Sequence, residues 1–132
     1  MLTHLGALSL LVRDYDEALT YYIGKLGFIL LEDTDQGGGR RWVVIAPAPA
    51  AATRLVLARA DTPEQEAAVG SQGGGRVWLF LHTDDFAHDY ARLRARGVEF
   101  VEEPRHESYG SVVVFRDLYG NKWDLLEPSQ PG

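Results

Sequence analysis

An acidic residue in an apolar segment near the C-terminus is the first candidate for chemistry. Asp124 lies between Trp123 and Leu125 in KWDLLE, a segment that otherwise has the composition of a β-strand. Strand alternation places Asp124 on one face with Lys122 and Leu126. The carboxylate is then either exposed on an outer face, with or without an arginine partner, or turned into a cleft, where it can bind a ligand hydroxyl or amine. The sequence offers no obvious second catalytic group beside it, which favours binding over catalysis.

A second set of candidates lies in RVWLFLH, residues 76–82, where Trp78, Phe80 and His82 have the same strand parity. Packing in the core is the ordinary role of Trp and Phe, whereas in a cleft the same face would form a wall for a flat or aromatic ligand. Histidine is the residue type best suited to proton transfer near neutral pH, so His82 is the general-base candidate and, with Asp124, one of two catalytic candidates. A hydrogen bond from His82 to the start of the next helix is an equally consistent structural role.

Two further segments can supply ligand contacts. Arg41 and Trp42 follow a run of glycines, and their opposite parity allows only one of them to face a cleft. Trp42 would extend an apolar wall there, whereas Arg41 would attract an anion. The segment EEPRHESYG, residues 102–110, reads as a loop, which is either a plain surface connection or a polar rim over the cleft. The rim candidates in this segment are Glu103, Arg105, His106 and Tyr109.

The elements that must position these residues occur in two similar series. In the first series the pattern predicts a helix that begins at Asp14 or Asp16 and strands over 4–12, 28–33, 41–46 and 54–60. In the second series it predicts a helix over 84–97 and strands over 76–82, 98–103, 111–115 and 122–127. VRDYDEALTYY aligns with TDDFAHDYARL at a constant offset, with Asp14 on Asp85. We therefore predict an α+β fold of two tandem βαβββ modules, 1–60 and 76–128, joined by a linker over 61–75 that runs from a short helical segment, DTPEQEAAV, into an exposed, flexible GSQGGG.

Composition excludes several classes of function. A net charge of −6 argues against non-specific binding to nucleic acid or to anionic membranes. No apolar run approaches the roughly 20 residues that span a bilayer, and no signal peptide is evident, so we expect a cytoplasmic protein. The absence of cysteine excludes disulfides, thiolate metal sites and a thiol nucleophile.

The duplicated pattern resembles the vicinal oxygen chelate superfamily, which includes glyoxalase I, bleomycin-resistance proteins and extradiol dioxygenases. The likeness covers nearly the whole chain. It is carried by VRDYDEALTYYIGKLGF (12–28), HTDDFAHDYARLRARGVEF (82–100), YGSVVVFRDLYGNKWDLLEP (109–128) and the repeat itself. The resemblance implies one glyoxalase-like domain, 1–132, whose two modules form an incomplete barrel around a cleft, and it implies a homodimer. Metal-dependent members bind a divalent ion with ligands on the first and last strand of each module.

Carrying those ligand positions over implies that the usual metal site is missing. Counting from the helix-start and turn aspartates gives Ala7, Trp78 and Asp124, and aligning the modules gives Val56 for the fourth position. Ala and Val offer no ligand atom, and the Trp indole is only a hydrogen-bond donor. We therefore expect no metal and no other cofactor, and the less favoured alternative is an atypical divalent site.

The favoured interpretation is a binding protein of the bleomycin-resistance kind that holds a small, partly aromatic molecule. Its expected ligand-binding residues are Trp42, Trp78, Phe80, His82, Arg105, Tyr109 and Asp124. The alternative is a lyase or dioxygenase of the same superfamily that uses an atypical metal site or acid–base chemistry by His82 and Asp124.

Overall fold

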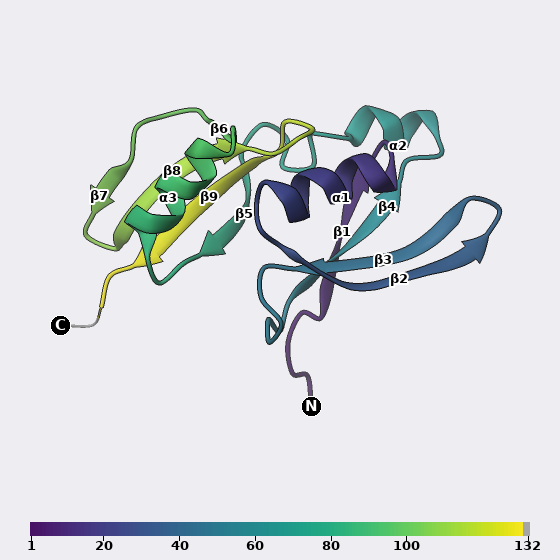
Figure 1. The fold of residues 1–132 in the computed structure, drawn as a ribbon, viewed down its shortest axis with the longest axis horizontal. Helices are drawn as coiled ribbons and strands as arrows, with labels where there is room; N and C mark the ends of the chain where they lie inside the picture. Colours follow the sequence, from purple (N-terminus) through teal and green to yellow (C-terminus); the bar gives the residue numbers. More distant parts are fainter. Residues whose placement is uncertain (131–132) are drawn as a thin grey trace. The chain divides into compact units, whose positions relative to one another are not determined.

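The computed structural model describes residues 1–130 and divides the chain into two compact units, Met1–Val69 and a second that begins at Gly70. The first unit contains β1 (Ala7–Val12), α1 (Tyr15–Gly24), β2 (Ile29–Gly37), β3 (Arg40–Ala46), β4 (Arg54–Arg59) and α2 (Pro63–Ala68) (Figure 1). The second contains β5 (Val77–His82), α3 (Phe86–Ala95), β6 (Glu99–Phe100), β7 (Arg105–Glu107), β8 (Gly110–Arg116) and β9 (Lys122–Pro128).

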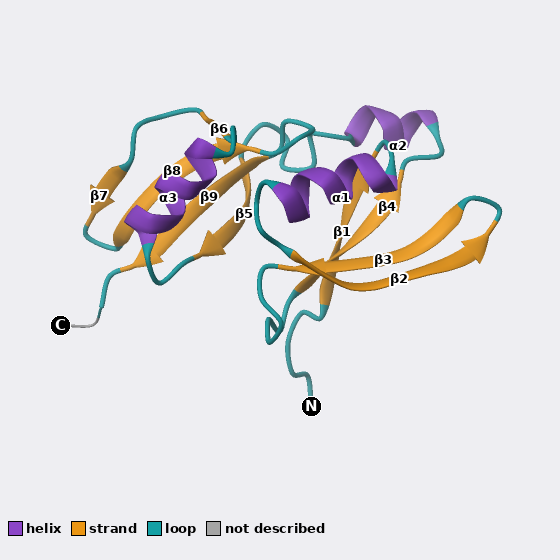
Figure 2. Cartoon of the chain, in the orientation of Figure 1, coloured by secondary structure: helices purple, strands orange, loops and turns teal. Residues whose placement is uncertain are grey.

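The two units have the same sheet topology, which confirms the duplication predicted from the sequence. The first sheet has the order β1-β4-β3-β2 and the second has the order β5-β9-β8-β6, with β7 pairing to β8 beside this path. In each sheet the first strand is parallel to the last, and the remaining pairs are antiparallel. A helix lies across one face of each sheet (Figure 2).

Helix starts follow the predicted capping chemistry. The Asp14 side chain accepts a hydrogen bond from the Glu17 amide, and the Asp85 side chain accepts one from the His88 amide. The sequence allowed either Asp14 or Asp16 as the N-cap of the first helix, and in the structure the cap is Asp14.

The core of the second unit lies between α3 and its sheet. Rings form a continuous series from Tyr90 of α3 through Phe100 and Phe115 to Trp123 of β9, with centroid separations of 4.8, 6.0 and 5.8 Å. Phe115 and Trp123 are buried, so this face of the sheet is the core face.

The turn between β8 and β9 is organised by one buried carboxylate. Asp117 accepts hydrogen bonds from the backbone amides of Tyr119, Gly120 and Asn121, and also from the side chains of Asn121 and Trp123. The DLYGN segment, residues 117–121, therefore has a structural role.

Several predicted boundaries differ from the structure, and the strand expected over 28–33 runs to Gly37. The strand expected over 98–103 is only Glu99–Phe100, and the expected loop over 102–110 contains the short strand β7. Residues 70–75, expected to belong to an exposed linker, instead contact the β8–β9 turn of their own unit. The Gln72 amide donates to the Asn121 side chain, and Gly70 packs so closely that an added Cβ would lie 1.9 Å from the Tyr119 carbonyl oxygen.

Candidate functional site

The face of the second sheet opposite α3 brings most of the predicted site residues together. Phe80 of β5 pairs with Asp124 of β9, which pairs with Val114 of β8. One pair further along, His82 lies beside Leu126. Paired residues point to the same side of a sheet, and the neighbouring Trp123 and Leu125 point to the core. We call this side the open face; it carries Phe80, His82, Arg105, Val112, Val114, Asp124 and Leu126.

Asp124 is the least satisfied polar group on the open face. Its Oδ1 atom is buried and has no hydrogen-bond partner in the structure. Phe80 and Val114 flank it on the neighbouring strands, so the carboxylate lies among apolar groups. Burial raises the pKa of Asp124 above its usual value, the charge of Arg105 opposes this rise, and the charge of Glu102 adds to it. The carboxylate therefore has one buried acceptor atom without a partner, while the residue as a whole is half-buried and reaches the surface of the face.

Arg105 is held by neighbours on β7 and beside it. Its guanidinium donates to Glu102 at 2.6 Å, to Glu107 at 3.3 Å and to the Tyr109 hydroxyl at 3.4 Å. These contacts raise the pKa of Arg105 and keep it charged, with the Glu102 hydrogen bond the largest cause. Because Arg105 pairs with Val112 on β8, it lies on the open face. Its surroundings supply two carboxylates, Glu102 and Glu107, that sequence reasoning did not select.

The polar sequence of β7 carries no strand signal that could have selected these groups, and only its pairing with β8 sets which of its side chains share a face. Alternation within Arg105–Glu107 turns Arg105 and Glu107 to one side and His106 to the other. His106 lies at 2.9 Å from the Ser111 hydroxyl, and its ring contacts Phe86 of the core at 6.3 Å. His106, predicted as part of the polar rim, therefore lies on the core face instead.

Trp78 was expected on the same strand face as Phe80 and His82, but the structure does not place it there by simple alternation. The β5–β9 register is irregular between Val77 and Leu79, so strict alternation fails at Trp78. The Trp78 ring makes an edge contact with the core ring of Trp123, at a centroid distance of 6.1 Å. Phe80, in contrast, is 62% exposed on the open face. Phe80 is therefore the accessible aromatic group of β5.

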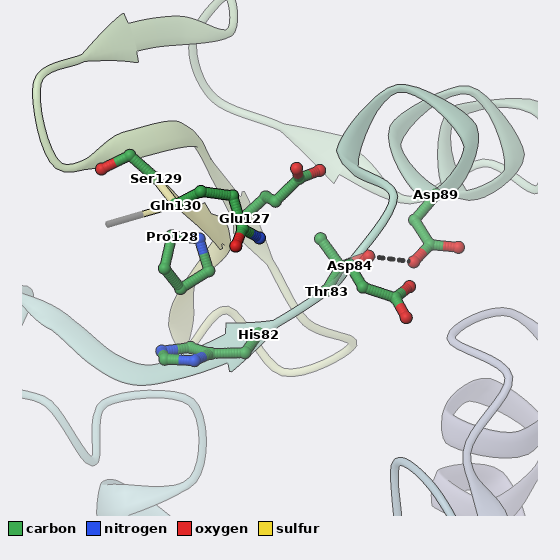
Figure 3. Close-up of a pocket in the computed structure, with 8 residues that line it drawn as sticks. All are labelled: His82, Thr83, Asp84, Asp89, Glu127, Pro128, Ser129 and Gln130. Carbon is green, nitrogen blue, oxygen red and sulfur yellow. Dashed lines mark hydrogen bonds between the residues drawn. The ribbon is translucent and has the colours of Figure 1, made fainter. Parts of the chain in front are cut away.

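His82 lies at the end of β5, at the margin of a cavity of about 650 Å³ (Figure 3). The helix start beside this cavity is held by other residues: Thr83 donates to Asp89 at 2.6 Å, and the Phe86 amide donates to Glu127 at 2.7 Å. Within residues 1–130, no ion pair joins His82 to Asp124. The two catalytic candidates thus lie on one face without forming an acid–base pair.

In the first unit, Arg41 and Trp42 point to opposite sides of the sheet, as their parity requires. Arg41 forms ion pairs with Asp16 of α1 at 2.9 Å and with Asp33 at 2.6 Å. These partners raise the pKa of Arg41, and its hydrogen bonds hold the pKa of Asp33 below its usual value. The Trp42 indole donates to Glu32 at 3.2 Å, and the residue is 41% exposed on the side away from α1. Trp42, and not Arg41, therefore lies on the sheet face away from the helix.

The residues at the four family ligand positions do not fit a divalent ion. Ala7 and Val56 pair with neighbours on the first sheet as ordinary strand residues, Trp78 packs on Trp123, and Asp124 alone supplies a carboxylate. Among residues 1–130, no group of three or more His, Cys, Asp and Glu side chains is placed to hold a metal. In the same part of the chain, no helix is long and apolar enough to cross a membrane.

Comparison with known proteins gives matches along nearly the whole chain. The sequence model of the Glyoxalase/Bleomycin resistance protein/Dioxygenase superfamily matches residues 2–125. A protein of Shewanella frigidimarina (strain NCIMB 400) is 52% identical over 121 residues, which cover 91% of this chain and 90% of the relative.

Two solved structures are also similar. UcmS2 is 30% identical, with a TM-score of 0.82 over 96% of this chain and 98% of its own. TnmS3, described as an antibiotic binding protein from Streptomyces sp. CB03234, is 35% identical, with a TM-score of 0.80 over 97% of this chain and 98% of its own.

Proposed function

The chain belongs to the glyoxalase/bleomycin resistance protein/dioxygenase superfamily, and from this premise we propose that it is a small-molecule-binding protein. The ligand is a small, partly aromatic molecule held against the open face of the second sheet. The observation that carries this proposal is the pairing of an exposed ring with an unused acceptor, Phe80 beside Asp124. The similarity to the antibiotic-binding TnmS3 supports the same class of function.

The open face has the composition of a recognition surface. Phe80 and Tyr109 are 62% and 53% exposed, so the face offers accessible aromatic rings to a ligand. Val112 and Val114 are themselves buried, so they support the face without contacting a ligand, while the ion pairs of Arg105 fix a polar margin. A flat ring can therefore stack on Phe80 while its polar substituents reach Asp124.

The other residues predicted to bind the ligand are assigned different roles. His82 and Tyr109 lie at the margins of the face and are proposed as ligand contacts. Trp42 belongs to the first unit, so it stays a prediction from the sequence and forms no part of the site proposed on the second sheet. Trp78 supports the wall from behind, through its contact with Trp123.

We propose no metal-dependent reaction, because the residues at the family ligand positions do not fit a divalent ion. The competing function, a lyase or dioxygenase with an atypical site, would require stoichiometric metal bound through Asp124. Elemental analysis of the purified protein after incubation with Ni, Zn, Fe(II) and Mn tests this directly. Bound metal that is lost in Asp124→Ala would overturn the proposal, and the same experiment on Glu64→Gln controls for non-specific binding.

The binding function itself is tested by a screen of flat aromatic compounds, read out by calorimetry. Phe80→Ala should weaken any hit by about tenfold, since ring stacking and apolar burial contribute about 1–2 kcal/mol. Leu30→Ala is the matched control, because Leu30 is also an exposed apolar residue, 44% accessible, but belongs to the first sheet. Equal weakening by the two variants, or no weakening by either, would contradict the proposal. The homodimer implied by the family remains part of the proposal and is tested by light scattering.

A further inference from the structure

We propose that Asp124 determines specificity on the open face and that the ligand carries a protonated amine beside its flat ring. This inference rests on the proposed function and names the ligand class of the same face. It is based on which hydrogen-bonding groups of the face are already used and which are not.

Arg105 is largely committed to neighbours. Its Nε and Nη1 atoms donate to Glu102, Glu107 and Tyr109, and the two carboxylates neutralise its charge. The Tyr109 hydroxyl is engaged in the same cluster. The donors of this cluster therefore offer little to an anionic ligand, whose charge would also meet Glu102 and Glu107.

Asp124 has the opposite character. An ionised carboxylate only accepts hydrogen bonds, and its Oδ1 atom is buried without a partner. Lys122 lies on the same face two residues before it, yet no ion pair joins Lys122 or Arg105 to Asp124 within residues 1–130. A buried charge without a partner is costly, and an ammonium group removes that cost while it gains a charge-assisted hydrogen bond.

The register fixes how far the amine can lie from the ring. Phe80 and Asp124 are direct partners on adjacent parallel strands, which are separated by about 4.8 Å. A ring stacked on Phe80 thus places a substituent one or two bonds from its edge within reach of the Asp124 carboxylate. An aryl-methylammonium group meets this distance requirement. A long flexible amine could reach the carboxylate without stacking its ring on Phe80, so it would not require that residue.

Three probes on one ring system separate charge from stacking: naphthylmethylamine, naphthylmethanol and naphthoate. They share the flat ring and differ in carrying an ammonium, a neutral hydroxyl or a carboxylate. Calorimetric titration at neutral pH compares each probe with the wild-type protein, with Asp124→Asn and with Glu64→Gln. Glu64 is an exposed acid of α2, so its variant has the same change in net charge as Asp124→Asn without altering the open face.

We expect the amine to bind the wild-type protein and Glu64→Gln about tenfold more tightly than the alcohol, and naphthoate to bind most weakly. In Asp124→Asn the amine and the alcohol should bind alike, while the alcohol keeps its wild-type affinity. Thermal unfolding checks that this variant is folded.

Two results would overturn the inference, and they differ from failure of the proposed function. Equal binding of the amine and the alcohol by the wild-type protein, or an amine preference that survives in Asp124→Asn, contradicts the role of Asp124 but leaves ring binding intact. Absence of binding by all three probes overturns ring binding on the open face, and the inference falls with it.

Discussion

Replacement of Asp124 by asparagine should stabilise the ligand-free protein at neutral pH. The substitution preserves the size of the side chain and removes a charge whose Oδ1 atom is buried without a partner. A buried unsatisfied polar group costs about 1–3 kcal/mol and a charged one more, and because asparagine leaves a neutral polar atom at the same place, only the excess cost of the charge is recovered. Because only one of the two oxygens is so placed, and the residue is partly accessible, we expect a gain at the low end, about 1 kcal/mol. For a chain of 132 residues this corresponds to a rise in Tm of about 3–4 °C.

The pH dependence of this gain has a defined sign. Burial raises the pKa of Asp124 in the folded protein, so the folded state holds this proton more tightly than the unfolded state does. The contribution of Asp124 to the free energy of unfolding therefore becomes more favourable as the pH falls through its raised pKa. The advantage of Asp124→Asn should be full at pH 7 and should shrink once the wild-type carboxyl is protonated.

Urea unfolding of the wild-type protein, Asp124→Asn and Glu64→Gln, at neutral and at acidic pH, measures both quantities. Glu64→Gln shows how much of any increase in the free energy of unfolding comes only from making the net charge of −6 less negative. A loss of more than about 1 kcal/mol in Asp124→Asn would instead indicate a buried ion pair. A difference from wild type that does not change with pH would also refute the reasoning.

Three further substitutions test the roles assigned to single residues. Asp117→Ala should lower the free energy of unfolding, measured by urea titration, by about 3 kcal/mol, because five hydrogen bonds to the Asp117 carboxylate are lost. A loss below about 1 kcal/mol would contradict this role. Gly70→Ala should cost about 2 kcal/mol or more by the same measurement, since its φ is 81° and a Cβ would overlap the Tyr119 carbonyl; a neutral effect would show that residues 70–75 are indeed a loose linker. Trp78→Ala should lower Tm more than Phe80→Ala does, because Trp78 packs on a core ring whereas Phe80 is largely exposed; the reverse order would return Trp78 to the open face.

The fold could be predicted because its determinants are local and occur twice. Strand and helix periodicities, capping aspartates and turn glycines recur at a constant offset, and the structure confirms both helices and the identical strand orders. Gly27 and Gly97, which follow the two helices, both adopt positive φ, 80° and 86°, a conformation that favours glycine after a helix. Such signals act over a few residues and need no knowledge of tertiary contacts.

The errors arise where pairing with another strand decides the local structure. The three residues of β7 form a strand only because β8 offers a partner edge, and the polar sequence RHE has no strand signal of its own. The same applies to Trp78, whose direction depends on an irregularity in the register with β9. Asp124 was correctly separated from the core by alternation, but its lack of a partner is visible only in three dimensions.

The central claim, that the open face of the second sheet binds a flat aromatic ligand, is tested most directly by methyl NMR during titration with naphthylmethylamine. The two strands β8 and β9 provide matched reporters, because Val114 and Leu126 lie on the open face while Val113 and Leu125 lie on the core face. We predict saturable shifts for the methyl groups of Val114 and Leu126, with much smaller shifts for Val113 and Leu125. Larger shifts on the core face, or shifts confined to the first unit, would contradict the account.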